Sequence, residues 1–398
     1  MGVAGRTRSI RGQFRAVWLA ELTSVLGDQL AKVAVTVLVY RDTGSAAWSG
    51  LVYALLLLPP LIAGPWLSGL GDRFDRRLVM VGCCLLQAAL VSAMIIPGIG
   101  LAATAVAVAL VSVLATPFKA AQGALLLDLF GAAGNMSANS QLATVRETGQ
   151  LLGLGGAAAV VAAVGITPAL LLDILSFLAA AALLMLCLPA HPLPDRPAST
   201  GAREGSSLRL VLRDQQLRAL TGLVLLNSLT MVPDGVVAPL ADEVGAPAWT
   251  VGLLLGADCL GVVGGSLWVA RRTPEQQAAL IAPMALLSLA PLAAFITRPG
   301  PVVLGLLLVI SGFGAAFLSL ASAQVTQRAP RHRAAAVRGV VGTGLRAGQG
   351  LAALAGGVFA QHLRSASAAI AIAGVVGVLL SAWFALGWQR TRPQAGAA

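Results

Sequence analysis

Long apolar stretches follow one another along nearly the whole chain. A helix needs about 20 apolar residues to cross a hydrocarbon core about 30 Å thick. Of the 398 residues, 57% are hydrophobic and 11% are charged, a balance too apolar for a soluble domain of this length. A transmembrane barrel would instead show alternating segments of about ten residues. The sequence therefore predicts an all-α membrane protein.

Twelve of these stretches are predicted to span the bilayer. The first is longer than the core of a signal peptide and has no small-residue cleavage pattern, so we expect it to remain in the mature protein. The four cysteines lie inside apolar stretches and are interpreted as packing residues. The expected spans are residues 14–40, 46–70, 78–97, 101–127, 139–164, 167–189, 216–240, 248–270, 276–297, 301–327, 335–362 and 366–388.

The basic residues are distributed unevenly between the predicted loops. Twenty of the 27 Lys and Arg residues lie before the first span, after even-numbered spans, in the C-terminal tail or among the first four residues of the span that follows such a segment. Cytoplasmic loops carry such an excess of Lys and Arg. We therefore expect a multi-pass protein of the inner cell membrane with both termini in the cytoplasm. This distribution also argues that the net charge of +11 does not serve nucleic-acid binding.

The apolar pattern is interrupted near the middle of the chain. Residues 190–215 contain three prolines and two glycines and are predicted to form a cytoplasmic linker. The linker separates a first six-helix bundle in residues 1–189 from a second in residues 216–398. At its end, apolar residues recur at helical spacing, which fits either a short surface helix or the start of the seventh span.

An internal repeat supports the two halves. Gly44-Ser-Ala-Ala-Trp48 before the second span is echoed by Gly245-Ala-Pro-Ala-Trp249 before the eighth, at an offset of about 200 residues. Duplicated halves facing a central site are typical of alternating-access transporters. Chance similarity between Leu-, Ala- and Gly-rich helices is the alternative.

The loop between the second and third spans carries a recognisable motif. Its sequence, Ser68-Gly-Leu-Gly-Asp72-Arg73-Phe-Asp75-Arg76-Arg77, resembles the signature loop Gly-x-Leu-Ala-Asp-Arg-x-Gly-Arg-Arg of the major facilitator superfamily. Ser68 and Asp75 replace the two glycines of that motif. The resemblance implies the major facilitator fold, with twelve transmembrane helices in two pseudo-symmetric six-helix bundles. It also implies a cytoplasmic latch formed by Asp72, Arg73, Asp75, Arg76 and Arg77, with Asp128 as a partner of Arg73 or Arg76.

Two further motifs narrow the resemblance. Ser24-Val-Leu-Gly27-Asp28 in the first span and Leu172-Asp173-Ile-Leu-Ser-Phe177 in the sixth resemble the macrolide-efflux branch of the drug:proton antiporters. That branch implies drug export coupled to proton entry. Gly149-x-x-x-Gly153 in the fifth span resembles the antiporter motif, with Leu154 at its proline position, and close helix packing is the alternative reading.

Charged residues within the spans are candidates for the transport site. Glu21, Asp28 and Lys32 share one face of the first span. Lys119 in the fourth span lies at about the depth of Glu21, and Lys119-Ala-Ala-Gln122-Gly resembles a superfamily motif associated with proton coupling. We predict that Asp28 or Glu21 accepts the proton, modulated by Lys119 or Lys32. A static Asp28–Lys32 ion pair is the alternative.

Other intramembrane charges complete the predicted substrate cavity. We expect its polar lining to include Gln122, Arg146, Asp234 and Asp258 beside the charges of the first and fourth spans. The resemblance implies that helices one, four, seven and ten surround this cavity. Asp173 lies nearer the outer face, where packing, gating and substrate contact remain open.

Other function classes find less support in the sequence. Neither lysine stands in a phosphate-binding loop, and no nucleophile–base or metal-ligand constellation appears, which disfavours an ATPase, an enzyme and a metal site. We therefore predict a monomeric exporter of hydrophobic or amphipathic small molecules that is coupled to protons. Its expected energy source is the proton gradient, and no cofactor is expected. A dedicated siderophore or metabolite exporter, a metabolite importer (symporter or uniporter) and an inactive membrane scaffold are the alternatives.

Overall fold

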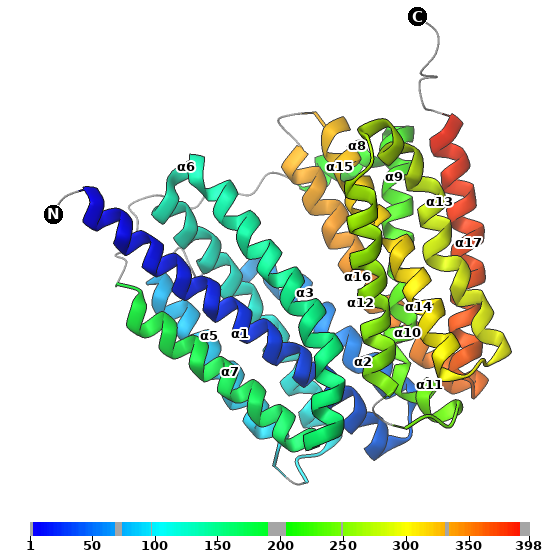
Figure 1. Cartoon of the computed structure of the whole chain (residues 1–398), viewed down its shortest axis with the longest axis horizontal. Helices are drawn as coiled ribbons and strands as arrows, with labels where there is room; N and C mark the ends of the chain where they lie inside the picture. The colour runs from blue at the N-terminus through cyan, green and yellow to red at the C-terminus, as the bar shows by residue number, and fades with distance from the viewer. Residues whose placement is uncertain are drawn as a thin grey trace, which may run out of the picture. The chain divides into compact units, whose positions relative to one another are not determined.

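All regular elements of the chain are helices (Figure 1). The structure is a computed structural model that describes residues 3–67, 74–96, 98–189, 204–247, 250–330 and 334–390. Within these ranges no strand occurs. The all-α class predicted from the apolar stretches is therefore confirmed.

The first half of the chain forms the six helices predicted there, with two changes in how they are divided. The second span is broken at Leu58, because the following prolines, Pro59 and Pro60, lack the N–H groups that a continuous helix needs. The fourth and fifth spans form one long element interrupted at Gly131, whose φ of 63° glycine adopts without steric cost. The elements are α1 (Val3–Thr43), α2 (Ala46–Leu57), α3 (Pro59–Leu67), α5 (Arg76–Met94), α6 (Leu101–Val164) and α7 (Ile166–Cys187).

The second half begins with a separate short helix. α8 (Glu204–Arg213) is followed by Asp214, whose carboxylate caps the next helix. The apolar residues at the end of the predicted linker therefore belong to a separate helix and are not the start of the seventh span. The seventh span itself is bent by 51°. The elements of this half are α9 (Gln215–Leu226), η1 (Asn227–Thr230), α10 (Met231–Gly235), α11 (Val237–Glu243), α12 (Thr250–Ala270), α13 (Pro274–Ala293), η2 (Ala294–Thr297), α14 (Pro301–Ala315), α15 (Phe317–Arg328), α16 (Ala334–Leu363) and α17 (Ala366–Arg390).

Most of the predicted spans pass a test of length and apolarity. Among the described residues, nine helical segments are long and apolar enough to cross a membrane, and the bent α9–α11 makes a tenth. The remaining two predicted spans are the second part of α6 and α16, which are helical but carry Arg146 and Arg346 in glycine-rich sequence. The helical segments of the structure thus correspond to the twelve predicted spans.

By its contacts the chain divides into two compact units. The first unit comprises Met1–Val39 and Leu55–Ser199, and the second comprises Tyr40–Ala54 and Thr200–Ala398. The corner between α1 and α2 therefore belongs to the second unit, where the hydroxyl of Tyr40 donates a hydrogen bond to Asp242 at 3.0 Å. This division differs at the corner from the halves expected from the sequence, 1–189 and 216–398.

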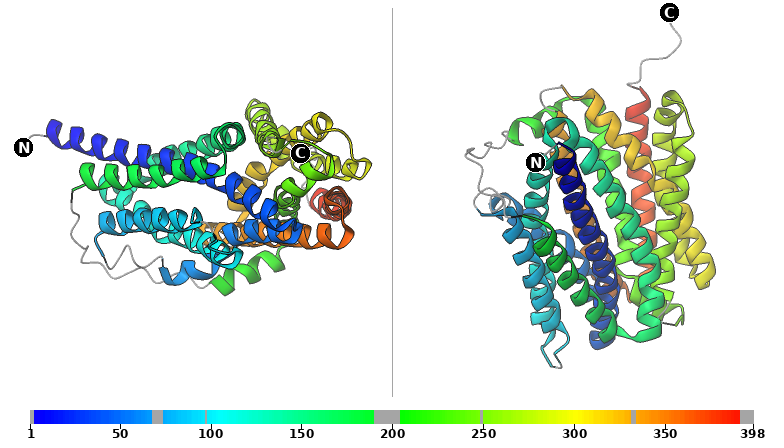
Figure 2. Two further views of the ribbon diagram at one scale, coloured as in Figure 1. Left: turned by 90° about the horizontal axis from the view of Figure 1, so that it is seen from below. Right: turned by 60° about the vertical axis from the view of Figure 1, so that its left-hand side comes forward.

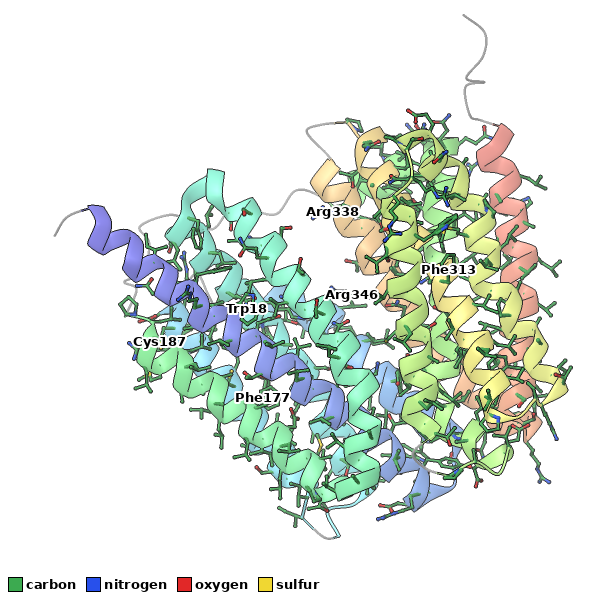
Figure 3. The ribbon with its side chains drawn as sticks, viewed as in Figure 1. Trp18, Phe177, Cys187, Phe313, Arg338 and Arg346 are labelled. Carbon is green, nitrogen blue, oxygen red and sulfur yellow. The ribbon has the colours of Figure 1, made fainter. Side chains whose placement is uncertain are left out.

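Each unit has its own core. In the first unit α5 packs against α6 and α7, and α1 runs beside α7 (Figures 1 and 2). Phe177 of α7 is fully buried there (Figure 3). In the second unit α12 packs closely against α14, and Phe313 of α14 lies against Trp268 with ring centroids 5.6 Å apart (Figure 3).

Candidate functional site

A small cavity lies between α1, α5 and both parts of α6 in the first unit. Its lining includes four of the charged residues singled out from the sequence, Glu21, Asp28, Lys119 and Arg146. Its volume is about 80 Å³. Pockets for drug-sized ligands measure about 300–1,000 Å³, and a water occupies about 30 Å³. The cavity therefore suits a few waters and protons, and a drug-sized substrate does not fit inside it.

Glu21 is held by two partners in this cavity. Its Oε1 accepts a hydrogen bond from Arg146 Nε at 2.7 Å, and its Oε2 accepts one from Gln122 Nε2 at 2.8 Å. The Glu21 side chain is only 4% exposed. Gln122 and Arg146 lie on opposite sides of the break at Gly131, so Glu21 connects α1 with both parts of α6. Both carboxylate oxygens are thus occupied by strong donors.

The ion-pair partner of Glu21 was not predicted from the sequence. Lys119 was expected at a similar depth, but the residue that the structure pairs with Glu21 is Arg146. Depth specifies how far along a helix a residue lies, and the face toward which it points depends on how the helices pack. Lys119 remains on the wall of the same cavity.

Asp28 lies two helical turns further along α1. Its side chain is exposed and lines the cavity. Among the described residues none forms a hydrogen bond or a close ion pair with its carboxylate, although the charges of Lys119 and Glu21 act on it from nearby. A carboxyl group open to cavity water can exchange a proton without first breaking an ion pair. This property distinguishes Asp28 from Glu21.

Glycines bring the second part of α6 close to α1. A Cβ atom at Gly149 would lie 3.0 Å from Val25, and one at Gly153 would lie 2.9 Å from Gln29. The small-x-x-x-small spacing therefore has a packing role at this interface. The exchange role implied by the antiporter motif stays a prediction.

One end of the first unit carries the described part of the predicted latch. Asp75 caps α5 by accepting a hydrogen bond from the backbone N–H of Arg77 at 2.9 Å. Arg76 forms an ion pair with Asp128 and donates to the carbonyl of Ala124 at 2.9 Å. Of the two partners expected for Asp128, the structure thus provides Arg76.

Arg77 is the remaining predicted latch residue that the structure describes. The guanidinium of Arg77 donates a hydrogen bond to the carbonyl of Met185, near the end of α7. Asp72 and Arg73 lie outside the described residues. The loop's last two arginines therefore connect α5 with α6 and with α7, both within the first unit.

Most of the sequence matches one family profile. Residues 17–341 match the Major Facilitator Superfamily. The chain belongs to this superfamily. It is therefore a multi-pass membrane transporter, which agrees with the fold predicted from the apolar stretches and the signature loop.

Solved structures share the superfamily fold at low identity. The nucleoside transporter NupG has a TM-score of 0.74 and 14% identity, covering 95% of this chain and 99% of that one. A bacterial homologue of the human lysosomal transporter Spinster has a TM-score of 0.68 and 13% identity, covering 100% of both chains. A bacterial homologue of the iron transporter ferroportin has a TM-score of 0.69 and 15% identity, covering 94% and 98%. A comparison with curated sequences finds no match. These likenesses establish the fold alone.

Four predicted cavity residues of this superfamily member do not line the small cavity. Gln122 of α6 is one of them, although it donates a hydrogen bond to Glu21. Lys32 is on α1 but does not line the small cavity. Asp234 is half-buried in α10, next to the bend of the seventh span, and Asp258 is half-buried in α12, where Gly312 of α14 packs on its backbone. Both belong to the second unit.

The small cavity also contains polar residues that the sequence reasoning missed. Ser24, Gln29, Gln87 and Gln150 line it beside the charges. Their signal in the sequence is an uncharged polar residue within an apolar span. Because serine and glutamine are tolerated in membrane helices, this signal alone is weak.

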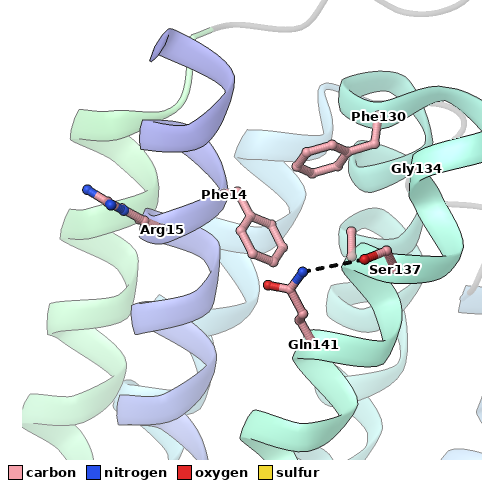
Figure 4. A pocket seen from close by; sticks show the side chains of 7 residues that line it. Phe14, Arg15, Phe130, Gly134, Ser137 and Gln141 are labelled. Carbon is pink, nitrogen blue, oxygen red and sulfur yellow. Dashed lines mark hydrogen bonds between the residues drawn. The ribbon is translucent and has the colours of Figure 1, made fainter. Parts of the chain in front are cut away.

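A second, larger pocket lies near the N-terminal end of α1 (Figure 4). Its volume is about 360 Å³. Phe14 of α1 points toward Phe130 of α6, with ring centroids 5.4 Å apart, and Gln141 donates a hydrogen bond to Ser137 at 3.5 Å. None of the residues predicted for proton coupling or for the substrate cavity lines it.

Proposed function

We propose that this transporter exports hydrophobic or amphipathic small molecules in exchange for protons by alternating access. The observation that supports this most is Asp28, an intramembrane carboxyl group that lines a small polar cavity and forms no close ion pair among the described residues. Ionisable residues within membrane helices are costly, and they usually mark ion or proton pathways. Resemblance to the macrolide-efflux branch supplies the direction of transport.

Charge balance in the cavity explains what a proton on Asp28 would do. Glu21 and Arg146 form a neutral pair, so the net charge of the wall is set by Lys119 and Asp28. With Asp28 ionised the wall is formally neutral, and with Asp28 protonated it carries one positive charge. Protonation thus changes the electrostatic environment by one unit, which biases the equilibrium between two conformations that expose different charge. Glu21 serves in this scheme to hold α1 against α6.

A dedicated exporter or importer of one polar metabolite is the second candidate. The described cavity has Phe118 as its one aromatic lining residue, whereas adaptable drug-binding surfaces are rich in aromatic and Met side chains. Solved structures with the same fold include a nucleoside transporter and a peptide transporter. This cavity is too small to hold the substrate, so the second candidate rests on these likenesses of fold and on the lack of a described aromatic surface.

The first test is proton movement in inverted membrane vesicles. Vesicles with an acidified lumen are challenged with lipophilic cations, macrolides, siderophores and nucleosides, and lumenal pH is recorded. We expect at least one substrate to trigger proton release with the native protein and not with Asp28→Asn. The matched control is Asp42→Asn, because Asp42 is an exposed carboxylate beyond the cavity, paired with Arg41.

Each outcome separates the candidates. Release with drugs supports proton-coupled efflux, and release with one polar metabolite supports a dedicated exporter. Silence across the panel with a folded protein would contradict proton antiport. Equal release in Asp28→Asn would exclude Asp28 as the coupling residue.

The proposed setting of the protein follows the charge distribution of its loops. We place it in the inner cell membrane as a monomer with both termini in the cytoplasm, and we assign the latch residues to the cytoplasmic face. The proton gradient is the energy source in this scheme.

A further inference from the structure

The two motifs that resemble the macrolide-efflux branch meet in the first unit. Gly27 of α1 packs directly on Asp173 and Ser176 of α7. A Cβ atom at Gly27 would lie 2.5 Å from Asp173 Oδ1 and 2.1 Å from Ser176 Oγ, both shorter than real side-chain contacts. Any residue larger than glycine would therefore force the side chains of Asp173 and Ser176 to shift. The carboxyl group of Asp173 thus packs on the residue that precedes the proposed proton carrier Asp28 in α1.

Asp173 is more enclosed than any other carboxyl group of this region. Its side chain is buried, with 1% of the residue exposed. The Ser176 hydroxyl lies 2.8 Å from the Asp173 backbone carbonyl oxygen and 3.4 Å from Asp173 Oδ1, so its hydrogen bond to the carboxyl group is the longer of the two. Among the described residues no cation pairs with this carboxylate. Burying a carboxylate that has no counter-charge and only one long hydrogen bond is costly, so the site favours the neutral acid.

Among the charged groups around the contact, only the carboxyl group of Asp28 acts directly on Asp173. On α1, Asp28 interacts electrostatically with Asp173. On α6, the cations Lys119 and Arg146 lie at the cavity, and Arg146 is already paired with Glu21. On α5, Cys84 is a buried thiol, which carries no charge in its ordinary form. Two interacting carboxyl groups do not ionise independently, so the buried Asp173 keeps its proton while the water-accessible Asp28 is charged.

We propose that Asp173 is a second proton-binding residue of the transport cycle, coupled to Asp28 across the Gly27 contact. This inference rests on the proposed function of Asp28. When Asp28 passes its proton to cavity water, its O–H bond breaks and a hydronium ion forms, while the O–H bond of Asp173 is retained. The neutral acid on α7 allows Asp28 to carry the only negative charge at this interface. The coupling residue is then a carboxyl pair contributed by α1 and α7.

Chemical labelling of protonated carboxyl groups tests the pair without requiring transport. Dicyclohexylcarbodiimide adds to a carboxylic acid in an apolar site, accepting its proton on nitrogen and bonding to its oxygen, and rearranges to a stable acylurea. The full-length protein in membrane vesicles is labelled between pH 5 and pH 9, as a chosen range of about four units around neutrality, and modified peptides are quantified by mass spectrometry. We expect Asp173 to be labelled at neutral pH, and the exposed Asp42 and Asp214 to remain unlabelled there.

The pH midpoint of Asp173 labelling in an Asp28 variant tests the coupling between the two carboxyl groups. In Asp28→Asn the neighbouring negative charge is absent, so Asp173 ionises more readily and the midpoint of its labelling moves to lower pH by about one unit or more. In Asp42→Asn the midpoint stays at its native position. An unlabelled Asp173 in the native protein at neutral pH overturns the proposal, even if Asp28→Asn does not fold. An unchanged midpoint in a folded Asp28→Asn protein overturns the coupling.

Failure of this inference is distinguishable from failure of the proposed function. If vesicles release protons with substrate but Asp173 is not labelled, Asp28 acts alone and the pair is rejected. If Asp173 is labelled with the expected shift but no substrate moves protons, the pair stands and proton-coupled export is rejected.

Discussion

At the scale of single residues, the ion pair between Glu21 and Arg146 is a contact whose loss should lower stability. The Glu21 side chain is 4% exposed, so Arg146→Ala leaves a buried carboxylate without its counter-charge. Breaking a buried pair in this way costs about 3–5 kcal/mol. We expect a corresponding fall in thermal stability of the purified protein. The double variant Glu21→Gln with Arg146→Met should recover much of the loss, because neither side then carries a charge.

The exposed pair of Arg41 and Asp42 is the control for this prediction. Their side chains are 68% and 55% exposed, and such pairs contribute at most about 1 kcal/mol. Arg41→Ala should therefore leave the melting temperature nearly unchanged. An equal fall in melting temperature in Arg41→Ala and Arg146→Ala would show that the buried pair contributes no more stability than the exposed pair.

At the scale of helices, glycine contacts hold α12 and α14 together in the second unit. A Cβ atom at Gly312 of α14 would lie 2.1 Å from the carbonyl oxygen of Asp258, a backbone atom that cannot swing aside. Gly312→Ala should therefore separate the two helices and cost about 1–3 kcal/mol of stability. Thermal unfolding in detergent measures this loss.

The same helix offers the matched control. A Cβ atom at Gly305 would meet nothing within 4 Å, so Gly305→Ala adds a methyl group in open space. Alanine is also the better helix former, by about 1 kcal/mol. Stability equal to or above the native value is expected, and comparable destabilisation by both variants would contradict the packing explanation.

At the scale of the whole molecule, the latch is expected to bias transport states without contacting substrate. Asp128→Asn removes the charge that pairs with Arg76 at the end of α5. A ligand-independent shift between conformations lowers turnover and leaves intrinsic substrate binding largely intact. We expect turnover to fall about fivefold or more, measured as the rate of substrate-driven proton release. Asp72→Asn should behave in the same way.

Equilibrium substrate binding is the second readout for the latch. A folded Asp128→Asn protein with weakened binding and unchanged turnover would contradict a latch role. Asp42→Asn, an exposed carboxylate change elsewhere, should alter neither quantity.

Local properties of the sequence were sufficient to predict the all-α fold class and the order of the helices along the chain. The length of each apolar run predicts a helix that spans the bilayer, because the hydrocarbon thickness sets that length whatever the neighbouring helices do. Two separate spans on either side of Gly131 were predicted, and a short helix before the seventh span was one of two alternatives; the structure gives the residues at which these helices begin and end. The signature loop was sufficient to indicate the superfamily.

The arrangement of the site depended on tertiary structure. The sequence placed Glu21, Asp28 and Lys119 in the membrane, but only packing decided that Glu21 pairs with Arg146 while Asp28 faces the cavity. Likewise the sequence contained Gly27 and Asp173 as separate motifs about 150 residues apart, and only the fold brought them into contact. Burial along one helix follows from its own residues, whereas the partner of a charge depends on which faces of different helices meet.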